Sequence, residues 1–151
     1  EKLSLWYNTE AQQACARHWA MFARRYKGIP NRNLSFNLLN EPSDIDKSVY
    51  IKVVKLLVEA IRLEDPDRLI IADGWNYGTT PLPELKELKI AQSMHNYQPI
   101  ELTHYKASWV EGSDTFPTPS WPADTLPWKT AATCWRCSGA RRRRCICCCS
   151  D

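Results

Sequence analysis

The stretch "LSFNLLNEPSD", residues 34–44, is an apolar run that breaks off into an amide, a carboxylate and a proline. Residues 33–39 are too few for a helix, are bounded by turn residues and are apolar at nearly every position. That pattern is typical of a strand covered on both faces. Glu41 follows this strand directly, and Pro42 biases its backbone toward an extended conformation that would point the side chain outward.

A carboxylate at the end of such a strand can serve as a proton donor. At the edge of a hydrophobic core, Glu41 is partly removed from water, which disfavours its charged form and suits it to proton transfer near neutral pH. A lone glutamate at a strand-to-loop boundary is also compatible with an ordinary surface residue. The rest of the sequence is needed to distinguish these two interpretations.

Helices are predicted on both sides of this strand. From Thr9 to Tyr26, apolar residues recur at intervals of three and four, and Thr9 with Gln12 forms a capping-box pattern. A second amphipathic helix is predicted from Lys47 to Leu63, with Asp44 or Asp46 available as its cap. We therefore expect the strand to lie between two helices.

Two further strands and a short helix are predicted downstream. The strands are "RLIIAD", residues 68–73, and "IAQSMH", residues 90–95, and residues 83–88 can form the helix. Helices and strands that alternate at this spacing indicate βα units, and right-handed crossovers would make the strands parallel. An open doubly wound sheet and a part of a (β/α)8 barrel both fit this order.

The polar residues favour the barrel. Each strand ends in chemically useful side chains: Asn40 and Glu41 after the first strand, Asp73 to Asn76 after the second, His95 to Tyr97 after the third. Catalytic groups of (β/α)8 barrels come from the C-terminal ends of several strands, and no Gly-rich phosphate loop follows any strand here. The sequence thus predicts an α/β fold, a partial (β/α)8 TIM barrel of about three parallel strands and their helices.

Composition excludes some classes of protein. No apolar run approaches the roughly 20 residues that span a bilayer, so no membrane association is expected. The first 128 residues carry 14 Lys and Arg against 16 Asp and Glu, whereas residues 129–151 carry six against one. The formal net charge of +3 therefore comes from the end of the chain.

The ordered motifs resemble glycoside hydrolase family 5, the cellulase family. "LSFNLLNEP" is preceded by "ARHWAMFARRYKGIPN" and followed by "LIIADGWNYG" and "MHNYQPIELTHYKASWV", and the resemblance extends from about Leu5 to Pro122. It implies that residues 1–128 are an incomplete catalytic domain of that family. The covered part would run from the third helix of the barrel through the loop beyond strand six.

The resemblance also implies roles for individual residues. Glu41 matches the general acid/base of a retaining mechanism, and Asn40 matches the residue that hydrogen-bonds the sugar 2-hydroxyl. His95 and Tyr97 match a His-x-Tyr motif that contacts substrate and holds the nucleophile. Trp75 and Trp109 could stack on sugar rings, although ordinary aromatic packing explains them equally well.

A retaining glycosidase needs a second carboxylate about 5 Å from the first. The family takes this nucleophile from a glutamate at the end of the seventh strand, and the sequence has no counterpart. Asp73, Glu101 and Glu111 do not stand at its place in the family order. We therefore expect this chain to be inactive alone.

The function implied by the resemblance is hydrolysis of β-glucans by the parent enzyme, with a β-linked polysaccharide or oligosaccharide as substrate. Cellulose-type substrates are the favoured prediction, and mannan, mixed-linkage glucan and β-1,3-glucan are the alternatives. No cofactor, metal, nucleic-acid or membrane partner is implied, and the family is usually secreted. A noncatalytic carbohydrate-binding remnant is the competing hypothesis.

The tail, residues 129–151, has a composition of its own. It holds six of the seven cysteines and the run Arg141 to Arg144. The cysteines could bind zinc, and the arginines could bind nucleic acid. The cysteine spacing matches no standard ligand arrangement, so we favour an aberrant or disordered segment, such as one produced by a frame shift.

Overall fold

The computed structural model describes residues 4–119, which belong to two compact units divided between Asn96 and Tyr97. Within these described residues, no helix is long and apolar enough to cross a membrane. The tail predicted at residues 129–151 lies outside the described part of the chain.

The first unit is built on a parallel sheet with strand order β1-β2-β3. The strands are β1 (Phe36–Asn37), β2 (Ile70–Asp73) and β3 (Ala91–Ser93). Phe36 pairs with Ile70, and Asp73 pairs with Ser93. The three predicted strands and their parallel direction are confirmed. Each strand is shorter than predicted, because ladder pairing covers only part of each predicted segment.

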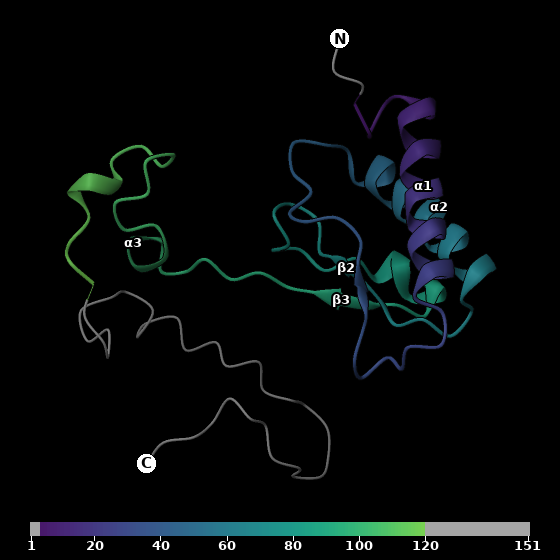
Figure 1. Cartoon of the computed structure of the whole chain (residues 1–151). Coiled ribbons are helices and arrows are strands. Elements are labelled where there is room, and N and C mark those ends of the chain that lie inside the picture. Colours follow the sequence, from purple (N-terminus) through teal and green to yellow (C-terminus); the bar gives the residue numbers. More distant parts are fainter. Residues whose placement is uncertain (1–3, 120–151) are drawn as a thin grey trace, which may run out of the picture. The chain divides into compact units, whose positions relative to one another are not determined.

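Two long helices pack side by side and cover the sheet (Figure 1). They are α1 (Thr9–Arg25), which precedes β1, and α2 (Lys47–Glu64), which connects β1 to β2. The connection from β2 to β3 contains η1 (Pro83–Leu88), a 3-10 helix. Both long helices and the short one lie where the sequence predicts them.

The helix caps differ in part from the prediction. The side chain of Asn8 accepts a hydrogen bond from the Ala11 N–H at 2.8 Å and caps α1, so the predicted capping box of Thr9 and Gln12 is wrong. Gln12 is instead buried and donates to the Trp6 carbonyl at 3.0 Å. Asp46 caps α2 through the Ser48 N–H at 2.7 Å, as one of the two predicted alternatives.

The hydrophobic core lies between the helices and the sheet. The Trp19 ring of α1 packs on Phe36 of β1, with ring centroids 5.4 Å apart. Phe36 and Leu38 are buried, whereas Asn37 between them is exposed, so the prediction that both faces of this strand are covered is wrong. The most completely buried apolar side chains are Ala23, Tyr50, Val53, Val54, Leu57, Ile61, Ile70, Ala72 and Leu82.

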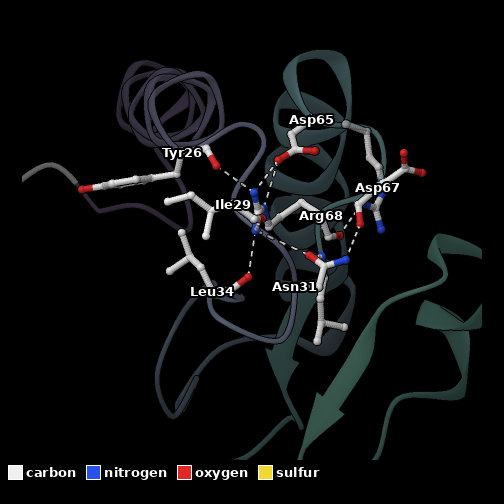
Figure 2. A network of polar contacts seen from close by, with 9 residues as sticks. Tyr26, Ile29, Asn31, Leu34, Asp65, Asp67 and Arg68 are labelled. Carbon is white, nitrogen blue, oxygen red and sulfur yellow. Dashed lines mark hydrogen bonds and ion pairs between the residues drawn. The ribbon is translucent and has the colours of Figure 1, made fainter.

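Arg68, just before β2, joins the ends of these elements through a buried polar network (Figure 2). Its side chain is 2% exposed and forms a salt bridge with Asp65 at 2.8 Å. The guanidinium also donates to three backbone carbonyls, those of Tyr26, Ile29 and Leu34, at 2.8–2.9 Å. One cation thus fixes the end of α1, the loop before β1 and the end of α2.

The second unit, described over residues 97–119, contains α3 (Ile100–Thr103) and η2 (Ser113–Thr115). Ala107 and Ser113 are buried, and the Ser113 hydroxyl donates to the Ala107 carbonyl at 2.7 Å.

Candidate active site

Three chemically useful side chains come together at the C-terminal ends of the three strands. Glu41 follows β1, Asp73 is the last residue of β2, and His95 follows β3. Because the strands are parallel and in register, their C-terminal ends meet at one edge of the sheet. The sequence predicted chemistry at each strand end, and these three residues meet there.

His95 contacts both carboxylates. Its Nδ1 lies 2.9 Å from Glu41 Oε1, and its Nε2 lies 3.1 Å from Asp73 Oδ2. The side chains of His95 and Glu41 are 19% and 29% exposed, whereas that of Asp73 is fully buried. Glu41 and His95 can therefore reach a bound molecule, and Asp73 can act only through its neighbours.

The backbone at Glu41 is held in an unusual conformation. Its φ of +48° lies in the left-handed region, so the predicted extended conformation is wrong. A non-glycine residue there costs roughly 1–2 kcal/mol, and neighbouring contacts must offset it. The Glu41 N–H donates to Asp73 Oδ2 at 2.9 Å, and the Pro42 carbonyl accepts from the Tyr77 N–H at 2.9 Å. Those two hydrogen bonds turn the chain against the local bias that Pro42 imposes.

The Asp73 carboxylate is stabilised by hydrogen bonds from N–H groups. In addition to Glu41 and His95, the Asn37 side-chain amide approaches Asp73 Oδ1 at 3.4 Å. The buried Tyr50 hydroxyl donates to the Asp73 backbone carbonyl at 2.8 Å. Burial raises the pKa of the Tyr50 hydroxyl far above its ordinary value, and the nearby Asp73 carboxylate raises it further. Tyr50 therefore stays a neutral donor.

The loop after β2 leaves room for the His95 ring. Gly78 has φ +75°, and a Cβ placed on it would lie 2.7 Å from His95 Cγ and Cδ2. The Gly78 carbonyl also accepts from the His95 N–H at 3.0 Å. Glycine is required at position 78 for two reasons: the backbone is left-handed, and the His95 ring occupies the space that a Cβ would fill.

Glu41 presents a carboxylate that a bound molecule can reach. Its carboxylate is partly exposed, and the hydrogen bond between His95 Nδ1 and Oε1 fixes the direction of one oxygen. The Asp73 carboxylate is not open to a bound molecule, because its side chain is buried and both of its oxygens face N–H groups. Within residues 4–119, no group of three His, Cys, Asp or Glu side chains is placed to hold a metal ion.

The remaining predicted site residues of the first unit lie near Glu41 in the sequence or in the loop after β2. Asn40 is exposed and precedes Glu41. The Trp75 indole N–H donates to the Ile45 carbonyl at 3.1 Å, and its ring is half-buried against the core. Trp75 therefore packs on the protein, as the alternative to sugar stacking predicts, and keeps only part of its surface open.

The other predicted site residues belong to the second unit. Trp109 is 79% exposed, and the Tyr97 ring packs edge-on against His104 with centroids 5.4 Å apart. His104 Nδ1 lies 2.8 Å from the Thr103 hydroxyl. This contact holds the His104 ring at the end of α3.

The sequence did not reveal what Asp73 does. The sequence places Asp73 at a strand end and, by the family order, not at the position of the nucleophile, but it predicts no partner for this carboxylate. A usable signal was present, because Asp73 ends an apolar strand next to the strand that precedes Glu41. The contact itself depends on the turn at Glu41, which local sequence rules predicted wrongly.

Comparisons with known proteins agree with this geometry. Among curated proteins, Endoglucanase C of Acetivibrio thermocellus is 34% identical over 101 residues, covering 63% of this chain and 29% of the relative. A crystal structure of a glycoside hydrolase matches with a TM-score of 0.72 and 41% identity, covering 81% of this chain and 38% of that one. Endoglucanase Cel5A of Thermotoga maritima matches with a TM-score of 0.65 and 28% identity, covering 78% and 40%.

These matches show the class of protein to which the chain belongs. The fold is part of the α/β barrel of the glycoside hydrolases, as predicted, and the chain spans less than half the length of each of these relatives. The family model for cellulase, glycosyl hydrolase family 5, matches residues 4–131. The chain belongs to the cellulase family, and further structures of the Thermotoga enzyme are complexes with cellobiose and with mannotriose.

Proposed function

We propose that this chain is the part of a β-glucan-hydrolysing catalytic domain that supplies the general acid/base, Glu41. The observation that supports it best is the contact between Glu41 and His95 at the C-terminal edge of the sheet, 2.9 Å apart. Both residues match the family motifs on which the resemblance rests. Glu41 protonates the leaving oxygen of a glycosidic bond and then activates the water that releases the sugar.

The substrate is proposed to be a β-linked glucan or a short oligosaccharide. The chain is similar to endoglucanases and to an enzyme that has been solved with cellobiose and with mannotriose. Asn40 and Trp75 are the proposed sugar contacts of the first unit, and Tyr97 and Trp109 those of the second. Trp109 is 79% exposed, so its ring is available for stacking on a sugar, and this exposure supports its assignment as a sugar contact.

The 151-residue chain alone is proposed to be inactive. A retaining mechanism needs a nucleophilic carboxylate about 5 Å from Glu41. Asp73 is the carboxylate in contact with the Glu41 backbone, and it is fully buried. We expect no release of reducing ends from a soluble β-1,4-glucan by the pure chain. Hydrolysis that disappears in Glu41→Gln would contradict this.

A segment exchange tests the role of Glu41 directly. Residues 4–119 of this chain replace the matching segment of the 41% identical glycoside hydrolase, which supplies the rest of the barrel. The hybrid should hydrolyse soluble β-1,4-glucan, and Glu41→Gln in the hybrid should lower kcat by about 100-fold or more. Glu87→Gln, in the exposed part of η1, is the matched control. If the hybrid is active and Glu41→Gln has no effect, Glu41 is not the acid/base.

The same hybrid separates catalysis from binding alone. A noncatalytic carbohydrate-binding remnant predicts that the isolated chain is retarded in a β-glucan gel while no folded hybrid shows turnover. Retardation should be absent in a gel containing an α-linked glucan, which controls for nonspecific adsorption.

A further inference from the structure

Asp73 is a buried anion whose partners come from all three strand ends. Its carboxylate is fully buried at the end of β2. It accepts the Glu41 N–H at 2.9 Å, faces His95 Nε2 at 3.1 Å and is approached by the Asn37 amide at 3.4 Å. Burying a carboxylate is costly unless hydrogen bonds compensate for the lost water. The residues around Asp73 supply that compensation, and two of them are the candidate catalytic groups.

The contact with His95 decides where the ring carries its proton. An ionised carboxylate can only accept, so Nε2 must be the protonated nitrogen that faces Asp73. Nδ1 then faces Glu41 Oε1 at 2.9 Å, and one proton lies between them. On Nδ1 this proton lets the ring donate to Glu41, and on Oε1 it lets Glu41 donate to the ring. In either arrangement one of the two groups donates and the other accepts, as the 2.9 Å contact requires.

The contact with Glu41 decides where the acid/base stands. Asp73 Oδ2 accepts from the Glu41 backbone N–H while that residue holds φ +48°. The same oxygen faces His95 Nε2. One oxygen atom therefore sets the backbone of Glu41 and the orientation of the ring that contacts the Glu41 side chain.

We propose that Asp73 is a positioning residue that fixes both the Glu41 backbone and the Nε2-protonated form of His95, so that His95 Nδ1 shares a proton with Glu41. Asp73 does not touch substrate, because its side chain is buried. The role of Glu41 as the acid/base rests on the proposed function, whereas the placement of the protons can be measured without any turnover.

The test is ¹⁵N NMR of the 151-residue chain, with native chain, Asp73→Asn and Asp44→Asn compared at neutral pH. In the native chain, His95 Nε2 should show the shift of a protonated ring nitrogen. The Glu41 amide proton and the His95 Nε2–H should exchange slowly with water. Asp73→Asn removes the charge that strengthens both hydrogen bonds, so both protons should exchange about tenfold faster or more. Asp44→Asn changes an exposed carboxylate of the loop after β1 and should leave both rates unchanged.

The outcomes are separable. Native exchange rates in a folded Asp73→Asn chain would overturn the proposal, and so would a native His95 whose Nε2 carries no proton. The second measurement needs no variant and decides the question even if Asp73→Asn does not fold. If the NMR result is as expected but the hybrid enzyme keeps its activity in Glu41→Gln, the proposed function fails and the positioning by Asp73 stands.

Discussion

Gly78 shows how closely the His95 ring is surrounded. Replacing Gly78 by Ala adds a Cβ 2.7 Å from two ring atoms and also forces a left-handed backbone onto Ala. The backbone alone costs about 1–2 kcal/mol, and overpacking adds about 1–3 kcal/mol. Urea unfolding of Gly78→Ala should show the sum, and the ring resonances of His95 should shift.

Gly28 is the matched control for this experiment. It also has a left-handed φ, +89°, but a Cβ there would meet nothing within 4 Å. Gly28→Ala should therefore lose only the backbone contribution and leave the His95 resonances in place. Equal losses of stability in the two variants would show that the ring has room to move.

Tyr50 gives the site a defined response to alkaline pH. Its hydroxyl has a raised pKa in the folded chain, chiefly because it is buried, while the unfolded value is about 10. The unfolded chain therefore loses this proton first, and the stabilising contribution is complete below pH 10 and is lost as the pH rises. Between pH 9 and pH 11 the free energy of unfolding should fall by about 1.4 kcal/mol more in the native chain than in Tyr50→Phe.

Urea titrations at the two pH values measure this difference. Tyr7→Phe, at a residue that is 68% exposed, is the control and should follow the native chain. If Tyr50→Phe and the native chain lose the same stability, the Tyr50 hydroxyl ionises equally in the folded and unfolded states.

Individual side-chain contacts were the least predictable part of this protein. The sequence placed Glu41 and His95 at strand ends, and a resemblance gave them roles. The φ of Glu41 could not be predicted, because the rule for a residue before proline is local and the Asp73 hydrogen bond that overrides it spans 32 residues. The contacts of His95 with Glu41 and Asp73 were missed for the same reason, because they also join residues far apart in the sequence.

Helix boundaries depend on shorter distances, and they were predicted more accurately. The apolar spacing of α1 and α2 gave both helices to within a residue at each end. The cap of α1 was the exception, since Asn8 and Thr9 are both good capping residues and only the backbone at the helix start decides between them. The strands were overextended in the prediction because apolar residues continue beyond the paired ones.

The cap can be tested by comparing two neighbouring variants. Asn8→Ala removes the acceptor of the Ala11 N–H and should lower the free energy of unfolding by about 1 kcal/mol. Thr9→Ala should cost nothing, because Thr9 is exposed and is already the first helical residue. Urea unfolding monitored by circular dichroism measures both. The reverse order would restore the capping box predicted from the sequence.

At the scale of the whole first unit, Arg68 is the residue that joins separate elements (Figure 2). Arg68→Met keeps much of the apolar volume but leaves Asp65 buried without its cation and three carbonyls without a donor. Breaking a buried pair in this way costs about 3–5 kcal/mol. We expect thermal unfolding of Arg68→Met at a much lower temperature than that of the native chain.

Arg24→Met is the matched control for the Arg68 variant. Arg24 also forms a salt bridge, with Glu64 at 2.6 Å, but its side chain is 70% exposed. Exposed pairs contribute little, so this variant should unfold close to the native temperature. A similar loss in both variants would mean that the effect comes from the arginine charge rather than from the buried network.

The shared carboxylate of Asp73 also has a consequence for how the sheet is assembled. Successive residues of a strand point to opposite faces, so a slip of β2 by one residue would turn Asp73 away from both neighbours. The hydrogen bonds to Glu41 and His95 would then be lost together, leaving a buried charge without partners. A sheet with a shifted register is therefore less stable at the edge that carries the candidate site. Asp73 thus favours the observed register of the strands as well as orienting the site.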